Sequence, residues 1–577
     1  MIEGLYPVLP FIVGALLCFV LSGIPRKIVA LATPVIGLLA LLGLPEGTSF
    51  QISFFGFDLI LAQVDKLSFL FALLFHIAGI IGVIYALHIK SRLETSSALL
   101  YAGSAVATVL AGDLVTLFLG WEMLALTSAF IVWAREDNKV LPVGSRYLVF
   151  QVLSGLSLLA GLLIHHQSGG SLLISDLGVL DLASPGVPWI LLAFGIKAGF
   201  PMFHTWIVDT YPAASATGTV FLSAFTTKTA VYALARFFPG TEELITIGAV
   251  MTFFPIFYAV IENDLRKVLS YSMINQIGFM VVGIGIGTEM AVNGAVSHAF
   301  NDVLFKGLLF MSMGAVMHVT GKTRGTDLGG LWRKMPITTV LCLVGAASMS
   351  AVPLCSGFVS KSMIMAAALH EGHTWLWFLL LFASAGVLEH AGIKIPYFAF
   401  FAHDSKLEAK EPPVNMLVAM SIGAALCIFI GCNPGWLYSM LPFTVSYEPF
   451  TTTHVLTQLQ LLLFASLSVV VLMKTGTYPP ELVRENLDFD VIYRKGGRFL
   501  GWIVNNPIAH GTRTISHFVL DEAPAKLLGL VQKIPAQPPV HWHVPWKQLP
   551  WYEQSFGHAI ISHADPLYPG KQWHVAL

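Results

Sequence analysis

The sequence predicts an all-α polytopic membrane protein with about 14–15 transmembrane helices and two inverted five-helix repeats, each containing one broken helix. Hydrophobic residues make up 55% of the 577 residues. Charged residues make up only 11%, whereas about 25% is usual in a soluble domain. Apolar runs of spanning length follow one another along most of the chain, and two of them are interrupted by glycine and proline beside a lysine.

The predicted spans are apolar over close to the roughly 20 residues that a helix needs to cross a bilayer. The fourth and fifth spans nearly meet at Gly112 and Asp113, so the sequence shows no clear loop between them. The predicted spans lie near residues 5–22, 28–45, 67–88, 96–112, 113–133, 145–165, 188–206, 213–236, 244–262, 268–288, 291–318, 336–361, 375–401, 413–433 and 454–473.

The loop charges predict the orientation of these spans. Loops that follow odd-numbered spans carry most of the loop Lys and Arg residues, whereas loops after even-numbered spans carry only Lys66 and Arg236. Cytoplasmic loops of membrane proteins carry an excess of positive charge. We therefore expect a multi-pass protein of the bacterial inner membrane with its N-terminus outside and its C-terminal tail in the cytoplasm. The first apolar run has no basic leader, so we expect a retained helix rather than a signal peptide.

We expect five regions along the chain. They are N-terminal transmembrane helices over 1–95, a first five-helix repeat over 96–240, a second over 241–405, C-terminal transmembrane helices over 406–474, and a cytoplasmic amphipathic or irregular tail over 475–577.

Neither the C-terminal tail nor the cysteines show a pattern that is typical of a metal or cofactor site. Segment 498–520 mixes apolar and polar residues and predicts an interfacial helix broken near Pro507. The late histidines of the tail match no metal-ligand spacing, and no pair of cysteines forms a C-x-x-C motif. We therefore expect no metal and no cofactor. The net charge of −1 gives no indication of nucleic-acid binding.

Two spans are broken in matching places. In span 188–206, Lys197 is followed by Gly199 and Pro201, and in span 336–361, Pro353 and Gly357 precede Lys361. A proline inside a helix removes a backbone hydrogen bond, and within a membrane the freed carbonyls must face protein or water. Each span is the fourth of five, which is typical of a transporter built from inverted repeats.

Five lysines and Glu122 stand out inside the predicted spans, although a charge at the centre of a bilayer costs about 2.5–3.5 kcal/mol. Such charge usually pairs with other buried charge or borders an ion path, so the sequence predicts a proton or ion conductor. We expect Glu122 to pair with Lys197, and the alternative is a protonated glutamate bonded to a backbone carbonyl. The six are Glu122, Lys197, Lys228, Lys306, Lys361 and Lys394.

One span carries a polar stripe. His298, Asp302 and Lys306 follow one another at intervals of four residues, which places them along one helix face. Histidine titrates closest to neutral pH and suits proton transfer, so we expect His298 and Lys306 to belong to a relay. Accessory candidates are Asp302, Glu389, His390 and Lys394. Lys394 is expected either to extend to the cytoplasmic interface or to pair with Glu389.

Six motifs together resemble the antiporter-like subunits shared by respiratory complex I and Mrp-type cation/proton antiporters. They occur in the family's order between about residues 60 and 435, and they read GWEMLALTS, AFGIKAGFPMFHTW, LSAFTTKTAVYALAR, NDLRKVLSYSMINQIGFM, HAFNDVLFKGLLF and LCSGFVSK. The resemblance implies a Glu122–Lys197 pair, a relay through Lys228, His298 and Lys306, and proton exchange with one bulk phase at Lys361. Two departures are Val208, where relatives often carry proline, and Asp302, where complex I relatives often carry His.

The C-terminal region TTTHVLTQLQLLLFASLSVVVLMKTGTYPPEL resembles D-type Mrp subunits. The expected function is that of an ion-translocating D-like subunit of a multi-subunit Na+/proton antiporter, with other membrane subunits, the bilayer, protons and Na+ as its partners. The alternative is a proton-pumping subunit of a complex I-like NADH:quinone oxidoreductase or a membrane-bound hydrogenase. The one glycine-rich run, Gly283–Gly287, ends a transmembrane helix and is not a nucleotide-binding loop, so we expect no redox chemistry in the chain itself.

Overall fold

The computed structural model describes residues 4–54, 56–135, 137, 139–483, 486–503, 505–506 and 518–531. The chain forms two units, Met1–Asp490 and Val491–Leu577. Helix α22 (Asp490–Ile503) begins at the division between the units, and α24 (Ala523–Val531) lies within the second unit. The predicted break at Pro507 and the predicted irregular tail beyond residue 531 lie outside the described residues.

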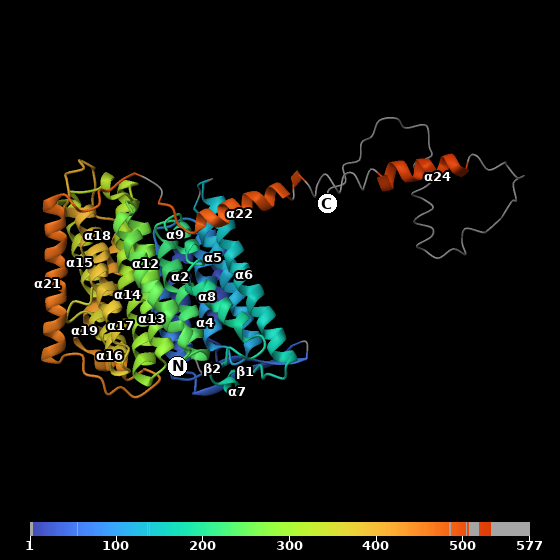
Figure 1. Cartoon of the computed structure of the whole chain (residues 1–577), viewed down its shortest axis with the longest axis horizontal. Helices are drawn as coiled ribbons and strands as arrows, with labels where there is room; N and C mark the ends of the chain where they lie inside the picture. Colours follow the sequence, from blue (N-terminus) through green and yellow to red (C-terminus); the bar gives the residue numbers. More distant parts are fainter. Residues whose placement is uncertain are drawn as a thin grey trace, which may run out of the picture. The chain divides into compact units, whose positions relative to one another are not determined.

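The first unit is a bundle of helices that run side by side (Figure 1). In the described part of the chain, eleven helices are long and apolar enough to cross a membrane, which confirms the predicted all-α polytopic fold. They are α2 (Gly23–Leu42), α3 (Lys66–Ala86), α4 (Arg92–Leu110), α5 (Leu114–Trp133), α6 (Val140–Gln167), α12 (Glu242–Ile261), α13 (Leu265–Ile286), α14 (Glu289–Thr320), the run Thr374–Phe401 that begins with α17 (Thr374–Val387), α19 (Val414–Cys432) and α21 (Thr452–Thr475). A shorter helix, α1 (Leu9–Val20), precedes them.

The two predicted helix breaks are present. One separates α8 (Val187–Ala198) from α9 (Thr205–Thr210), and α8 ends at Gly199, whose φ of +78° suits a residue without a side chain. The other separates α15 (Pro336–Met349) from α16 (Ser356–His370). Each break leaves backbone carbonyls of the preceding helix without a helical partner.

Two further irregular segments were not predicted from the sequence. The span predicted over 213–236 is divided at Phe225 into α10 (Gly218–Ala224) and α11 (Thr226–Phe237), just before Lys228. A π-helical segment, Leu388–Ile393, follows α17 and precedes Lys394. Such wide turns occur frequently at functional sites.

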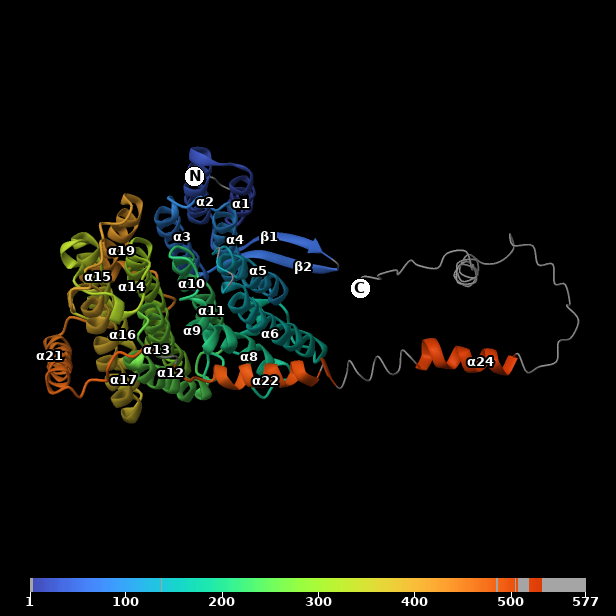
Figure 2. The same cartoon turned by 90° about the horizontal axis from the view of Figure 1, so that it is seen from above.

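A β-hairpin stands between α2 and α3, where only a loop was expected. Strands β1 (Gly47–Phe54) and β2 (Phe57–Val64) pair antiparallel, and Figure 2 shows the hairpin beside α5. The Ile60 N–H donates to Asp113 Oδ2 at 2.7 Å, and the Gly112 N–H donates to the Ile60 carbonyl at 2.9 Å. Asp113 also caps α5 by accepting from the Thr116 N–H at 2.8 Å. The hairpin thus fixes the short α4–α5 connection.

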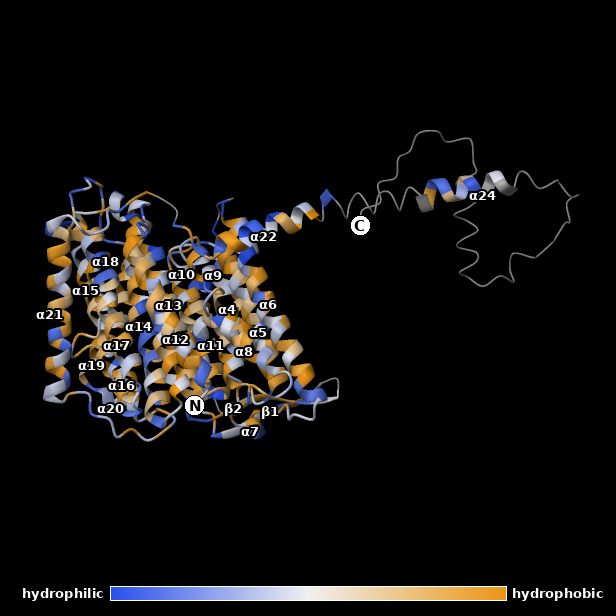
Figure 3. Ribbon diagram, in the orientation of Figure 1, coloured by the Kyte–Doolittle hydropathy of each residue, from blue (hydrophilic) through white to orange (hydrophobic). Residues whose placement is uncertain are grey.

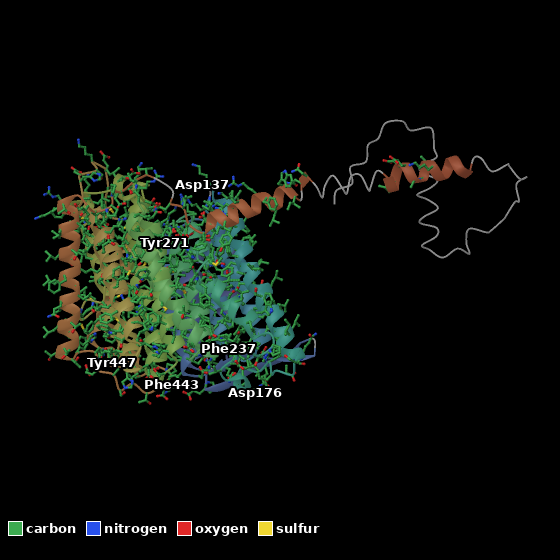
Figure 4. All side chains as sticks on the ribbon, viewed as in Figure 1. Asp137, Asp176, Phe237, Tyr271, Phe443 and Tyr447 are labelled. Carbon is green, nitrogen blue, oxygen red and sulfur yellow. The ribbon has the colours of Figure 1, made fainter. Side chains whose placement is uncertain are left out.

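Consecutive loops lie at opposite ends of the first unit. Asp137, which follows α5, and Tyr271 lie towards the upper end in Figure 4, whereas Asp176, Phe443 and Tyr447 lie towards the lower end. Hydrophilic segments gather at both ends, and the helices between them are largely hydrophobic (Figure 3).

The burial of the helices separates an inner layer from an outer one. In the most hydrophobic 18-residue stretch of α13, 94% of the residues are buried, whereas in that of α21 only 11% are. Leu463 and Phe464 of α21 are 66% and 63% exposed. Apolar side chains exposed along a spanning helix suit contact with lipid or with another membrane subunit. The lysines considered below are buried inside this bundle.

Candidate functional site

Lys197 lies at the end of α8, immediately before the first helix break, and is fully buried. Its Nζ donates to the Trp121 carbonyl of α5 at 2.6 Å and lies 4.3 Å from the centroid of the Trp121 indole ring. The indole face stabilises a cation held over it. Lys197 is therefore held by the residue next to Glu122, and it interacts electrostatically with that carboxylate. In the part of the chain that the structure describes, Glu122 and Lys197 do not form a direct ion pair.

The Glu122 carboxylate occupies a slot against α6. A Cβ added at Gly155 would overlap Glu122 Oε1, so the absence of a side chain at Gly155 makes this placement possible. Glu122 Oε1 is buried and has no hydrogen-bond partner among the described residues. A carboxylate oxygen with no partner in such a site readily accepts a proton or a water molecule.

The centre of the site is an ion pair between two helices. Lys228 Nζ of α11 lies 2.6 Å from Asp302 Oδ2 of α14, and both side chains are fully buried. Lys228 also donates to the Ser223 carbonyl at 3.2 Å, which is near the break between α10 and α11. Asp302, which the sequence predicts to be an accessory residue, lies at this central pair.

The other members of the α14 stripe contact different neighbours. His298 hydrogen-bonds with Gln276 Oε1 of α13 at 3.1 Å through Nε2 and with Ser360 Oγ of α16 at 3.0 Å through Nδ1. Lys306 Nζ donates to Ser272 Oγ of α13 at 3.0 Å. Both side chains are fully buried. The stripe therefore connects α14 to α13 and α16 through hydroxyl and amide groups that can both donate and accept.

Lys361 lies in α16, beyond the second break. Its Nζ donates to the Met349 carbonyl at 3.0 Å, which the end of α15 leaves free, and it lies 5.2 Å from the centroid of the Phe279 ring. Lys306 Nζ lies 3.3 Å from the sulfur of the same Met349. Lys197 and Lys361 thus have similar settings, in which an ammonium group meets a backbone carbonyl and an aromatic face.

The accessory candidates form a branch near the π-helical segment. His390 Nε2 hydrogen-bonds with Ser272 Oγ at 3.0 Å, so Ser272 contacts both His390 and Lys306. Lys394 is almost completely buried, at 1% exposed, so its ammonium group does not reach bulk water. Its ion-pair partner is Glu481, at 2.8 Å, instead of Glu389. Glu389 accepts a hydrogen bond from the Tyr478 hydroxyl at 2.6 Å.

A line of polar side chains along α6 was not predicted from the sequence. Ser154 accepts from Trp121 Nε1 at 2.9 Å, and the Tyr147 hydroxyl donates to Ser128 Oγ at 2.7 Å. Between them lies Gln151, fully buried, whose amide has no hydrogen-bond partner among the described residues. The spacing of Tyr, Gln and Ser in RYLVFQVLSG, at intervals of four and three residues, is the signal that could have identified this face.

The polar line continues towards Lys228. The Tyr101 hydroxyl of α4 hydrogen-bonds with Thr226 Oγ1 of α11 at 2.5 Å, two residues before Lys228. Together with the α6 face, these hydroxyls extend from the region of Glu122 to that of the central ion pair. In the part of the chain that the structure describes, no group of three or more His, Cys, Asp and Glu side chains could hold a metal ion. The arrangement is suited to proton transfer between buried titratable groups.

The chain is similar to membrane subunits of known antiporters and hydrogenases. The transmembrane model of the NADH:quinone oxidoreductase/Mrp antiporter family matches residues 111–386. The D subunit of a Na+/H+ antiporter from Alkalihalophilus pseudofirmus is 30% identical over 339 residues, which cover 54% of this chain and 68% of that protein. Hydrogenase-4 component B of Escherichia coli is 26% identical over 422 residues, which cover 65% of this chain and 62% of that component.

A solved structure shares the fold. A chain of an archaeal respiratory membrane complex, the membrane-bound sulfane sulfur reductase, superposes with a TM-score of 0.71 at 22% identity, and the match covers 97% of this chain and 98% of that one. This chain spans only part of several curated relatives. For hydrogenase-4 component B and three antiporter subunits, the matched region covers between 40% and 62% of the relative's length.

Proposed function

Because this chain belongs to the NADH:quinone oxidoreductase/Mrp antiporter transmembrane family, we propose that it is a D-type, ion-translocating subunit of a multi-subunit Mrp-type antiporter. It exchanges Na+ for protons across the cytoplasmic membrane, together with other membrane subunits of the assembly. The residues proposed to carry the protons are Glu122, Lys197, Lys228, His298, Lys306 and Lys361.

The observation that carries this proposal is the fully buried Lys228–Asp302 ion pair, which has further buried lysines on both sides. Buried charge in a membrane marks ion and proton paths more often than it stabilises a fold. Lys197 and Lys361 are each held by a backbone carbonyl, and neither has a carboxylate in a direct ion pair among the described residues. A desolvated ammonium without a paired carboxylate loses its proton more readily than one in water.

The proposal includes an orientation and two repeats. Spans four to eight form the first inverted repeat and spans nine to thirteen the second, so that Lys197 and Lys361 occupy equivalent places in their fourth spans. The end that carries the Lys- and Arg-rich loops faces the cytoplasm, in keeping with the excess of positive charge there.

A transport assay on the whole assembly tests the proposal. The complete operon is expressed in a bacterium that lacks its own Na+/proton antiporters, and inverted vesicles are assayed for dissipation of a proton gradient on addition of Na+. We expect dissipation with the intact operon and none in the Glu122→Ala and Lys197→Ala variants at equal abundance of the complex. Full activity in both variants would rule out the Glu122–Lys197 part of the relay.

A second candidate function is a proton-pumping subunit of a respiratory or hydrogenase assembly. It is supported by the similarity to hydrogenase-4 component B over 422 residues and by the fold shared with the respiratory complex over 97% of this chain. In the same vesicles, this function predicts no response to Na+ but acidification that depends on oxidation of NADH or hydrogen. The two readouts separate the candidates, because the antiporter needs no electron donor.

The Gly155 slot gives a further test of Glu122. Gly155→Ala is expected to slow transport several-fold, because the added methyl group overlaps the carboxylate oxygen and displaces the Glu122 side chain. The matched control is Gly307→Ala in α14, next to Lys306, where an added Cβ meets no atom within 4 Å. The control should transport Na+ and protons like the wild type. Equal rates in both variants would show that the position of Glu122 does not limit transport.

A further inference from the structure

A compact group of charges lies where the chain after α21 crosses back over the bundle. Residues 478–483 and 486–488 of this crossing segment pass over the upper end of α18 (Lys394–Pro396) and α12 in Figure 1. Three side chains of this segment form hydrogen bonds with the bundle. Tyr478 donates to Glu389, and Asn486 donates to Glu262 Oε2 at 3.0 Å. Asp488 Oδ2 accepts from the Tyr271 hydroxyl at 2.8 Å. The crossing segment is therefore anchored by polar groups along its length.

The central contact is the ion pair between Glu481 of the crossing segment and Lys394. The side chains are 7% and 1% exposed. Lys394 Nζ also donates to the carbonyls of Val260 and Glu262, at 2.6 and 2.7 Å, at the end of α12. Lys394 thus has its donors fully used and stays in place, while Glu481 Oε2 and Glu389 Oε2 are buried without a hydrogen-bond partner among the described residues.

The charge balance of this group favours an extra proton. Glu389 and Glu481 interact with each other and with Lys394, and Glu262 has its own donors, the N–H groups of Asn263 and Asp264. Glu262 also interacts with Glu481, so at least two carboxylates share the Lys394 cation, and a buried net negative charge is costly unless one carboxylate is protonated. Burial raises the pKa of the Glu481 carboxyl above its ordinary value even though Lys394 counteracts the effect.

The group is also connected to Lys306 of the α14 stripe through Ser272 and His390. Ser272 hydrogen-bonds with both Lys306 Nζ and His390 Nε2, at 3.0 Å each. His390 is adjacent to Glu389 and lies on the same π-helical segment, four residues before Lys394. Its Nδ1 is buried and has no hydrogen-bond partner in the described part of the chain. The imidazole thus has one nitrogen towards Ser272 and Lys306, and its ring also interacts with the backbone of Gly386, which suits an Nδ1–H that can be passed on.

We propose that Glu481, with Glu389 and Lys394, forms a proton-exchange site that connects Lys306 to the bulk phase at the end of the bundle covered by the crossing segment. The Lys306 ammonium gives a proton to Ser272 Oγ as that hydroxyl gives its own proton to His390 Nε2. This leaves a neutral amine and an imidazolium. The imidazolium then releases the Nδ1 proton to a carboxylate of the group, which becomes a carboxylic acid and later gives the proton to water. All steps are also possible in reverse.

The proposal rests on the proposed function, since the site serves the same relay, and two measurements keep the two apart. In vesicles that contain the full assembly, Glu481→Gln is expected to slow proton transfer at least about tenfold, because a positioned proton carrier is lost. Glu481→Asp, which keeps a carboxylate, should recover most of the rate. The matched control is Asn486→Ala, which removes another anchor of the crossing segment and should retain the wild-type rate and its dependence on pH.

The second measurement is independent of transport. Infrared spectra of the purified assembly, recorded over a range of pH, should show a protonated-carboxyl band that Glu481→Gln or Glu389→Gln removes and Asn486→Ala does not. A wild-type rate and pH profile in Glu481→Gln, or no change in this band in either glutamate variant, would overturn the exchange site. Wild-type vesicles that move no protons would instead overturn the proposed function, whatever the infrared band shows.

Discussion

Lys228→Met is expected to destabilise the folded protein by about 3–5 kcal/mol, because it leaves the Asp302 carboxylate buried without its cation. Asp302→Leu should cost a similar amount by leaving the Lys228 ammonium unpaired. Both side chains are fully buried and 2.6 Å apart, so water cannot replace the missing partner. The free energy of unfolding, measured by denaturant titration in mixed micelles, gives the size of the effect.

The double variant Lys228→Met/Asp302→Leu separates stability from transport. Replacing both members of a buried ion pair by apolar groups of similar size is often neutral or stabilising. We therefore expect the double variant to recover most of the stability and none of the proton transfer in the vesicle assay. Lys322→Met, at an exposed loop position, is the control and should change neither. A double variant that transports protons at the wild-type rate would exclude the central pair from the relay.

The fold was largely predictable because hydrophobic length is a strong signal in a membrane protein. Every predicted span corresponds to one helix or to a pair of helices on either side of a break, except the span over 375–401, in which π-helical segments follow α17. The β-hairpin at 47–64 was missed because its strands are short and lie between two stronger apolar runs. The break at Phe225 was missed because no glycine or proline marks it, so packing around Thr226 and Lys228 determines it.

The candidate site was predictable residue by residue but not in its contacts. An ionisable residue in an apolar run is visible in the sequence, and so Lys197, Lys228 and Lys306 were identified. Which partner each one meets depends on how distant helices pack, and spacing along one helix does not contain that information. The pairing of Lys228 with Asp302, and of Lys394 with a glutamate almost ninety residues further along, required the three-dimensional structure.

The carboxylates that pair with buried cations from outside the helices could not be predicted from the sequence. Glu481 and Asp488 lie in a segment that composition alone assigns to a cytoplasmic tail, yet their side chains are almost completely buried, at 7% and 6% exposed. Burial on its own would raise the pKa of the Asp488 carboxyl, but hydrogen bonds from His204 and Tyr271 outweigh it and hold the pKa below the ordinary value. Polar residues after a last span therefore have to be considered as possible parts of the bundle.

Lys197→Arg is expected to abolish proton transfer while the assembly remains folded. Arginine keeps the positive charge, can donate to the Trp121 carbonyl and can stack on the Trp121 ring, which are the contacts that hold Lys197. A guanidinium does not lose its proton under the conditions of a protein. The variant therefore preserves every electrostatic role of Lys197 and removes only its ability to release a proton.

The measurement is Na+-dependent dissipation of the proton gradient in vesicles, at equal abundance of the assembly, with Lys322→Arg at an exposed loop position as the control. Loss of transport in Lys197→Arg, with the control at the wild-type rate, means that Lys197 itself gives up and takes back a proton. Retained transport would mean that Lys197 acts only as a fixed charge, and the proton would then have to pass from the Glu122 slot to the hydroxyls of α6 without it. The two outcomes distinguish a carrier from an electrostatic support, which Lys197→Ala cannot do because alanine removes both properties.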